Sequence, residues 1–288
     1  MKDATHSSRR QMLALAGALG LAPAAARGAP ASATGKARAR ERFLPGRDPS
    51  LTGPPPPQAP AREGYFDVPG GRLWYWDTGG KSAPVVLMHP MTGSALSWVY
   101  QQPVLAKAGY RVMAFSRRGA FRSEVDPAVE EETPGDDLAI FADALRLPPF
   151  HLVGAAAGGF AAVRYAIAHP GRLRSLAVAG SMMGLSEPEH VARTRALMPP
   201  IFQQLPAEFR ELSPSYRAVN PEGVKRWLEI EESALSAKVD KAPPKVQAAT
   251  MARSTAGPGY ADLRTLRVPT HLIFGDADLY SPPALARP

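Results

Sequence analysis

The fold is decided by residues 150–159, which read FHLVGAAAGG. Residues 150–153 are a short, mostly apolar run typical of a buried strand, and residues 160–168 follow as a helix. Every residue between these two elements is Gly or Ala. Outward from this segment the order of strand and helix repeats, which predicts an α/β fold with a mostly parallel sheet and helices on both faces.

Apolar runs and turn residues on either side predict the other elements. Residues 65–68 and 72–76, separated by a Pro-Gly-Gly turn, predict a hairpin. We expect further strands at 84–88, 111–115, 174–179 and 268–275, and helices at 95–108 and 134–145. Residues 182–268 contain helical stretches only, at 187–197, 207–212, 221–235 (capped by Asn220) and 244–251. They predict a helical lid inserted between two strands of one sheet.

Composition narrows the function classes. The 288 residues contain no Cys, which excludes disulfides, thiolate metal sites and a Cys nucleophile. The formal charge is +8, but ten basic and three acidic residues in positions 1–62 carry +7 of it. The remainder is nearly neutral, so nucleic-acid binding is not supported. No pair of His residues has metal-ligand spacing, and we expect neither a metal nor another cofactor.

The N-terminal residues predict an export signal followed by a linker. Arg9 and Arg10 precede an apolar run at 12–26 that is too short for a stable membrane span. Small residues follow, and the paired arginines resemble a twin-arginine signal. We therefore expect residues 1–33 to direct the folded protein through an export machinery to the periplasm or the extracellular space. The Pro-rich residues 34–62 predict a linker.

Four segments, in this order, resemble the α/β-hydrolase superfamily, in its lid-bearing branch of esterases, peptidases and carbon–carbon hydrolases. They read VLMHPMTG at 86–93, FSRRGAFRS at 115–123, LVGAAAGG at 152–159 and GDADLYSP at 275–282. The resemblance implies an α/β-hydrolase core at 63–181, a lid at 182–268 and a return to the core at 269–288.

By this resemblance, residues 154–158 form the nucleophile elbow, the sharp turn that presents the attacking residue. Gly154 and Gly158 stand where the pattern Gly-x-Ser-x-Gly has its glycines, so the turn can form. The middle position is Ala156, which has no oxygen with which to attack. Ser181, at the end of the next strand, is a candidate for a displaced nucleophile.

The resemblance places the acid of the triad at Asp278, whose alternative role is a turn carboxylate. The family carries its catalytic His after a further strand, but none of the six histidines here follows Asp278. We therefore expect the fold to be C-terminally truncated relative to the family, either as a natural form or as a fragment of a longer product.

The resemblance also implies two oxyanion donors, the N–H groups of Met91 and Ala157. Pro90 departs from the usual Gly of that loop, and Ser116 replaces an Asp that is common there. The candidate pocket residues are His89, Thr92, Ser94 and Met182.

These features favour a protein of hydrolase ancestry with an acyl-type pocket and no Ser nucleophile or triad His. We expect a pseudoenzyme with a binding or vestigial role toward a small apolar or acyl molecule. One alternative is a serine-independent enzyme for carbon–carbon, proton-transfer or hydrolytic chemistry whose natural chain is longer. Another is an exported interaction protein that uses its Pro-rich arm.

Overall fold

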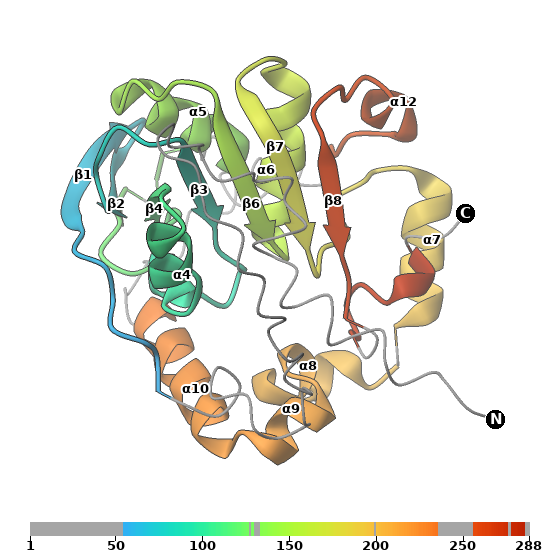
Figure 1. Cartoon of the computed structure of the whole chain (residues 1–288). Coiled ribbons are helices and arrows are strands. Elements are labelled where there is room, and N and C mark those ends of the chain that lie inside the picture. Colours follow the sequence, from blue (N-terminus) through green and yellow to red (C-terminus); the bar gives the residue numbers. More distant parts are fainter. Residues whose placement is uncertain are drawn as a thin grey trace, which may run out of the picture.

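The computed structural model describes residues 54–126, 128–129, 133–198, 200–235, 256–275 and 278–285. The predicted export signal, most of the predicted linker and the predicted helix at 244–251 lie outside these residues. Eight strands form one sheet (Figure 1). The strands are β1 (Arg62–Val68), β2 (Gly71–Asp77), β3 (Pro84–Met88), β4 (Arg111–Phe115), β5 (Glu124–Val125), β6 (Phe150–Ala155), β7 (Leu173–Ala179) and β8 (Thr270–Ile273).

Helices connect these strands. The α-helices are α4 (Gln101–Lys107), α5 (Pro134–Ala144), α6 (Ala157–Ala168), α7 (Pro188–Leu197), α8 (Ala207–Glu211), α9 (Pro214–Val219), α10 (Pro221–Leu235) and α12 (Tyr260–Leu263). The 3₁₀ helices are η1 (Ala95–Trp98), η2 (Phe202–Gln204) and η3 (Pro283–Leu285). None of the helices in the described part of the chain is both long and apolar enough to cross a bilayer.

The sheet runs in the order β1-β2-β4-β3-β6-β7-β8, with β5 beside β2. Strands β4, β3, β6, β7 and β8 are parallel neighbours, whereas β2 pairs antiparallel with β1, β4 and β5. The predicted α/β fold with a mostly parallel sheet is confirmed. All parallel strands point their carboxyl ends toward α8, α9 and α10 (Figure 1), which places the loops after these strands at the end of the sheet that the lid helices cover.

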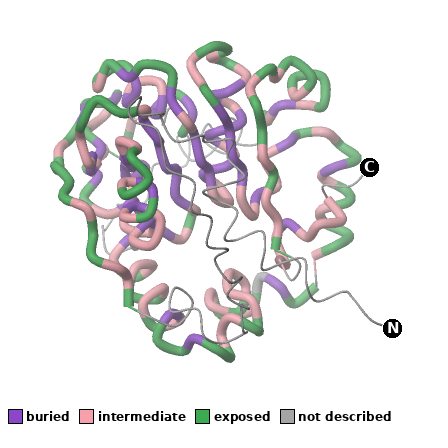
Figure 2. The backbone as a smooth tube through the Cα atoms, in the orientation of Figure 1, coloured by how far each residue is buried: buried purple, intermediate pink, exposed green. Residues whose placement is uncertain are grey.

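The core has two layers, one on each face of the sheet (Figure 2). On one face, Leu138 and Phe141 of α5 and Tyr165 of α6 pack against Val86 and Leu152. On the other face, Trp98 of η1 and Leu105 of α4 pack against the alternate residues of the same strands, which include Val85, Leu87 and Val153. Strand β3 is buried throughout because helices cover it on both sides.

The prediction of a single helix at 95–108 is wrong, because the structure has two helices there, η1 and α4. Pro103 explains the break, since it has no N–H to donate to the carbonyl of Val99. In the structure Pro103 lies in the first turn of α4, where no such bond is needed, and Gln58 Nε2 donates to the Val99 carbonyl at 2.7 Å instead.

The described end of the predicted linker is attached to the core. The N–H of Ala59 donates to Oε1 of Gln102 at 2.9 Å, and its carbonyl accepts from Nε2 of the same side chain at 2.8 Å. Gln102 is buried. Strand β1 then begins at Arg62, the last residue of the predicted linker.

The lid segment contains more helices than the periodicity predicts. Helix α10 matches the prediction for 221–235, and Oδ1 of Asn220 accepts from the N–H of Gly223 at 2.8 Å, as expected of its cap. Helix α9 was not predicted, although Ser213 caps it and Pro214 follows in its first turn. Helix α12 also lies outside the predicted helices.

Strand β8 is shorter than the strand predicted at 268–275, and it is partly exposed. Within the described residues it pairs only with β7, so it forms the edge of the sheet. Its side chains alternate between exposed and half-buried, and Leu272 is 46% exposed.

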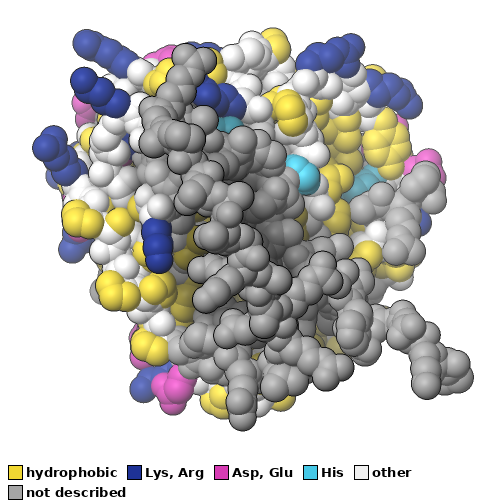
Figure 3. Space-filling view, viewed as in Figure 1, with side chains coloured by type: hydrophobic (Ala, Val, Ile, Leu, Met, Phe, Trp, Pro, Cys, Tyr) yellow, Lys and Arg dark blue, Asp and Glu magenta, His cyan; other side chains and the backbone are white. Residues whose placement is uncertain are grey.

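On the face shown in Figure 3, Lys and Arg side chains lie scattered along the rim.

Candidate functional site

Ala156 is the one residue between the end of β6 and the start of α6. Its backbone angles, φ 47° and ψ −115°, belong to a region that residues with a Cβ rarely adopt. Its N–H donates to the carbonyl of Ala179 at 2.9 Å, and its carbonyl accepts from Oγ of Ser181 at 2.6 Å. Bonds from the next strand and loop therefore hold a strained turn at a half-buried alanine.

The flanking glycines are required by close backbone contacts. A Cβ added to Gly154 would lie 2.4 Å from the carbonyl oxygen of Gly158. One added to Gly158 would lie 2.1 Å from the carbonyl oxygen of Met88. No side chain fits at either distance, so β3, β6 and α6 can approach this closely only with glycine at both positions.

The hydroxyl of Ser181 stabilises the turn at Ala156 and is not free to act as a nucleophile. Its hydroxyl donates to the Ala156 carbonyl, and Oγ accepts from the N–H of Met183 at 3.0 Å. The side chain is 2% exposed. Because its proton is committed to a backbone carbonyl and its oxygen is buried, Ser181 is poorly placed to act as a displaced nucleophile.

The two predicted oxyanion donors come from neighbouring strand ends. Met88 of β3 pairs with Gly154 of β6, so the loop that carries Met91 starts beside the elbow. Met91 is 69% exposed. Ala157 is the first residue of α6, where an N–H has no partner inside the helix and the helix dipole favours negative charge.

His89 is buried behind this loop. Its Nδ1 lies 2.7 Å from the carbonyl oxygen of Pro90, and the N–H of Arg117 donates to its Nε2 at 3.0 Å. Nε2 is therefore the acceptor and Nδ1 carries the proton. Burial, followed by the charge of Arg117, lowers the pKa of His89 well below its ordinary value. A neutral, fully engaged imidazole suits a brace for the loop, not a proton acceptor for substrate.

The same loop receives a second bond from Arg117, whose Nη2 donates to the Pro90 carbonyl at 2.9 Å. Ser94 is buried and caps η1 by accepting from Leu96. Ser116, which stands where an Asp is common, is buried and accepts from the N–H of Ala95 at 3.3 Å. The other pocket candidates, Thr92 and Met182, are half-buried.

Asp278 lies beside the segment that holds the elbow. A Cβ added to Gly180 would be 3.2 Å from Oδ2 of Asp278, and the preceding residue, Ala179, accepts the N–H of Ala156. Oδ1 accepts from the N–H groups of Tyr280 and Ser281, both at 2.9 Å, and Oδ2 accepts from Oγ of Ser281 at 2.9 Å. Both carboxylate oxygens are therefore engaged locally, and no imidazole bonds to them in the described part of the chain.

Sequence reasoning missed a contact between the lid and the loop that carries Asp278. Arg210 of α8 donates from Nη1 to the phenol oxygen of Tyr280 at 3.3 Å. The ring of Phe202 in η2 meets the Tyr280 ring edge-on, with 4.6 Å between centroids. The position of Tyr280, two residues after the predicted acid, is the one available signal, but nothing in the sequence indicates its lid partners.

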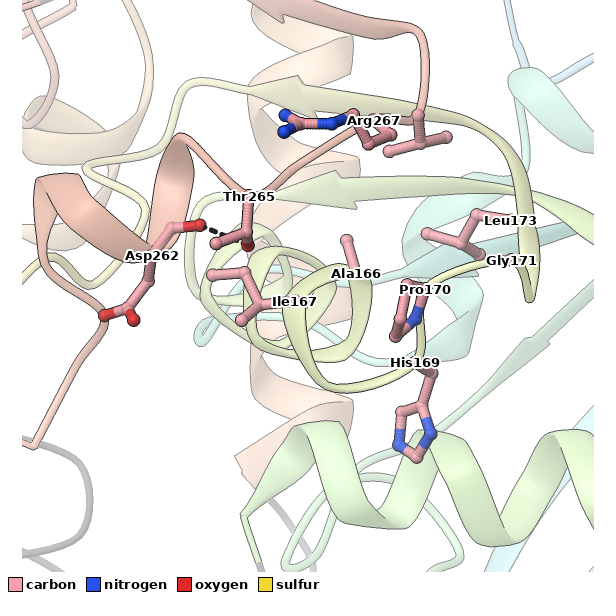
Figure 4. A pocket seen from close by; sticks show the side chains of 10 residues that line it. Ala166, Ile167, His169, Pro170, Gly171, Leu173, Asp262, Thr265 and Arg267 are labelled. Carbon is pink, nitrogen blue, oxygen red and sulfur yellow. Dashed lines mark hydrogen bonds between the residues drawn. The ribbon is translucent and has the colours of Figure 1, made fainter.

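The cavity drawn in Figure 4 lies away from the elbow. It has a volume of about 380 Å³ and is lined by residues that include His169, Leu173, Asp262 and Arg267. Leu173 begins β7, whereas the elbow follows the carboxyl end of β6, so the cavity lies at the opposite end of the sheet. A second groove of about 620 Å³ runs between residues 56–59 and α4. Neither space borders Ala156.

Among the described residues, no three His, Asp or Glu side chains gather as a metal site would require. The arrangement instead combines a strand-to-helix elbow, a braced loop after the adjacent strand and a carboxylate after a later strand, all at the end of the sheet covered by lid helices. These features define the α/β-hydrolase class.

Comparison with known proteins gives the same result. A sequence model of the α/β hydrolase fold family matches residues 83–285, and the chain belongs to that family, as the four motifs led us to expect. Bifunctional epoxide hydrolase 2 of Rattus norvegicus is 33% identical over 130 residues, which are 44% of this chain and 23% of the relative. The putative carbamate hydrolase RutD of Caulobacter sp. (strain K31) is 37% identical over 113 residues, 38% of this chain and 40% of the relative. The matches thus span well under half of each relative.

Solved structures share the fold over more of the chain. A thermophilic esterase from Thermogutta terrifontis has a TM-score of 0.57 at 26% identity, covering 79% of this chain and 84% of the esterase. An enol-lactonase from Burkholderia xenovorans LB400 has a TM-score of 0.58 at 23% identity, covering 78% and 85%. The lactonase likeness, at this identity, concerns the fold alone.

Proposed function

We propose that this protein binds a small apolar or acyl molecule between the elbow and the lid, and does not hydrolyse it by a serine mechanism. Ala156 carries the proposal. The turn keeps the strained backbone, the two crowded glycines and the helix N-terminus that serve a nucleophile, while the side chain that it presents is a methyl group. Such strain persists only where surrounding bonds enforce it.

The expected loss of rate supports a binding role. Removing a triad nucleophile costs about 10⁶ in turnover in a serine protease and leaves only about 10³–10⁴ over water. Because nucleophile and His act as a unit, losing both costs little more. An acyl group held by the oxyanion loop would then be bound with little turnover.

Apolar side chains on the lid support an apolar ligand. Six of the exposed large apolar residues in the described part of the chain belong to the lid segment: Leu197, Ile201, Phe209, Val219, Leu228 and Tyr260. Met91 of the oxyanion loop is also exposed. Exposed apolar groups gathered in one part of a protein mark ligand grooves or partner surfaces. The relatives named above, an epoxide hydrolase and a putative carbamate hydrolase, suit an ancestor that acted on small molecules.

A serine-independent enzyme is the second candidate, and one observation favours it. Glu211 follows Arg210, the lid residue that donates to Tyr280, and burial raises the pKa of the Glu211 carboxyl, as suits a general acid or base. Two observations count against this candidate. Both oxygens of Asp278 already accept hydrogen bonds from Tyr280 and Ser281, and the Ser181 hydroxyl donates to a backbone carbonyl, so neither group is available as a base. An interaction role for the Pro-rich arm is a separate proposal that no comparable contact supports.

Turnover and binding, measured on the same preparation, test the proposal. We expect no hydrolysis of p-nitrophenyl butyrate above that of an Asp278→Asn variant, yet measurable binding of a short acyl amide by calorimetry. Met91→Asp should weaken this binding about tenfold or more. The variant places a carboxylate on surface that the bound ligand would cover, and the carboxylate would lose its hydration there. Val104→Asp, at a residue 52% exposed on α4, is the matched control. Hydrolysis at an ordinary enzymatic rate that a serine-directed inhibitor stops would refute the proposal.

A fluorophosphonate probe separates a formed site from a collapsed one. Wild-type protein should stay unlabelled, whereas Ala156→Ser should be labelled slowly at position 156, because the elbow and oxyanion donors remain and only the oxygen has been supplied. Labelling of the wild type at Ser181, the candidate for a displaced nucleophile, or at another serine would refute the proposal that the protein lacks a serine mechanism.

We also propose that residues 1–33 direct export by a twin-arginine route and that the ligand is met outside the cytoplasm. The motif at Arg9 and Arg10 supports this proposal. Because the chain has no Cys, it cannot form unwanted disulfides in an oxidising compartment.

A further inference from the structure

One buried hydroxyl joins the elbow to the start of the lid segment. Ser181 lies two residues after the end of β7. Its Oγ donates to the carbonyl of Ala156 at 2.6 Å and accepts from the N–H of Met183, at the start of the lid segment, at 3.0 Å. A serine hydroxyl has one proton to donate and lone pairs to accept, so one side chain can make both bonds. Ser181 therefore bonds to the backbone of two segments that are far apart in the sequence.

Each of these two segments carries a strained residue at its bond to Ser181. The angle φ is 47° at Ala156 and 60° at Met183. In the described part of the chain only two other residues with a Cβ have a positive φ, Arg122 and Arg146. Such conformations persist only where the surroundings enforce them. Two of these four positions thus share one hydrogen-bonding partner.

Helix α6 leaves space for this arrangement. A Cβ added to Gly159 would lie 2.5 Å from Oγ of Ser181. A Cβ added to Gly184, which follows Met183, would lie 2.9 Å from the ring of Phe160 in α6. The first turn of α6 therefore packs against both the Ser181 hydroxyl and the first residues of the lid segment, and glycine is needed at 159 and 184 for this contact.

We propose that Ser181 is a positioning residue for the ligand site. Its hydroxyl fixes the direction in which the elbow presents residue 156. The same hydroxyl fixes the place where Met182, a predicted pocket residue, enters the lid segment, because Met182 lies between Ser181 and the bonded N–H of Met183. Without the hydroxyl, a buried carbonyl and an N–H each lose a hydrogen bond, and both segments relax toward other partners.

A thiol at position 156 measures the effect on the elbow. The chain has no Cys, so Ala156→Cys supplies a single thiol next to the N-terminus of α6, which favours the reactive thiolate. Adding Ser181→Ala should move this thiol away from the helix end. Its pKa, obtained from the pH dependence of iodoacetamide alkylation, should rise toward the ordinary value of about 8.5, and alkylation at pH 7 should slow about three- to tenfold.

Amide hydrogen exchange measures the effect on the lid segment. In Ser181→Ala the N–H of Met183 loses its acceptor and should exchange about tenfold faster or more, while the amides of β3 stay protected. The variant removes one oxygen and adds no atom, so the fold has no new group to accommodate.

Ser123→Ala is the matched control for both measurements. The Ser123 hydroxyl has the same bonding pattern, since it donates to the carbonyl of Ser116 at 2.7 Å and accepts from the N–H of Trp74 at 3.1 Å. Ser123 is buried as well, at 7% exposed. A general loss of stability would therefore affect both variants alike, whereas a positioning role predicts that Ser123→Ala leaves the thiol at position 156 and the Met183 amide unchanged.

Both ends must respond for the proposal to hold. A thiol pKa that stays the same or falls in Ser181→Ala, an unchanged exchange rate at Met183, or equal changes in Ser123→Ala would overturn it. Residue 156 and Met182 belong to a ligand site only if the proposed function holds, but neither measurement uses a ligand. A failure to bind the acyl amide would therefore refute the proposed function while the positioning of the two segments by Ser181 is judged separately.

Discussion

Ala156 combines a strained backbone, in the turn between β6 and α6, with a methyl side chain that has no atom able to attack a substrate. The position has φ 47°, a value that costs alanine but not glycine. The bonds to Ala179, Ser181 and Gly159 maintain this conformation. Under the proposed binding function chemistry does not require this strain, and the close packing of β6 and α6 against β3 maintains it.

This strain predicts that Ala156→Gly stabilises the protein. Relief of the positive φ should gain about 1–3 kcal/mol, offset by about 0.5–1 kcal/mol for the greater freedom of glycine when unfolded, a net rise of about 1 kcal/mol in the free energy of unfolding. Urea unfolding followed by circular dichroism measures it. Ala162→Gly, in the interior of α6, is the control and should destabilise. A loss of stability in Ala156→Gly would show that the turn is not strained in solution.

At the scale of elements, a buried ion pair joins helix α5 to the segment after β4. Arg118 donates from Nε and Nη2 to both oxygens of Asp137, and its Nη1 donates to the carbonyl of Pro69 at 2.8 Å. The two charged side chains are 6% and 2% exposed. One guanidinium therefore links three chain segments with little access to water.

Removing one partner of this pair should be costly. Asp137→Ala leaves a buried guanidinium without its carboxylate and should lower the free energy of unfolding by about 3–5 kcal/mol. Asp143→Ala, on the same helix, breaks the exposed pair with Arg172 and should cost about 0–1 kcal/mol. Denaturant titration of both variants checks the prediction, and equal costs would contradict the buried geometry.

Apolar runs were sufficient to predict the parallel strands, since burial on both faces leaves a continuous signal, as in β3. Short elements without periodicity escaped prediction. Helix α9 has six residues and strand β5 has two, too few for a pattern to emerge. The break at Pro103 could have been predicted from its missing N–H, but the substitute bond from Gln58 depends on chain folding.

The candidate site shows the same division. The elbow position of Ala156 follows from the local pattern of glycines. The hydrogen bond from Ser181 to the Ala156 carbonyl and the contact of Tyr280 with the lid could not be predicted from the sequence, because the two partners of each contact come from different elements. Sequence spacing identifies which strand end a residue follows, whereas hydrogen-bond partners depend on how the loops pack.

At the scale of the whole molecule, the export proposal has its own test. Replacing Arg9 and Arg10 together by Lys should retain the full-length chain in the cytoplasm, whereas the wild type should appear outside it in a shortened form. Cell fractionation with an N-terminal sequence of the mature chain measures both. Replacing Lys36 and Arg38, in the predicted linker, is the control and should leave export unchanged. Export of the double Lys variant at the wild-type level would contradict a twin-arginine route.

We propose that this fold retains a formed elbow whose side chain faces the site but lacks the attacking atom. Because the chain has no Cys, Ala156→Cys creates a single thiol there, and the pH dependence of its alkylation gives its pKa. At the N-terminus of α6 the thiol should react readily with a pKa below the ordinary value of about 8.5, whereas Val104→Cys, exposed on α4, should show about 8.5. An unreactive thiol at position 156, or a pKa raised above that of the control, would show that the residue is packed into the core and that no elbow is presented.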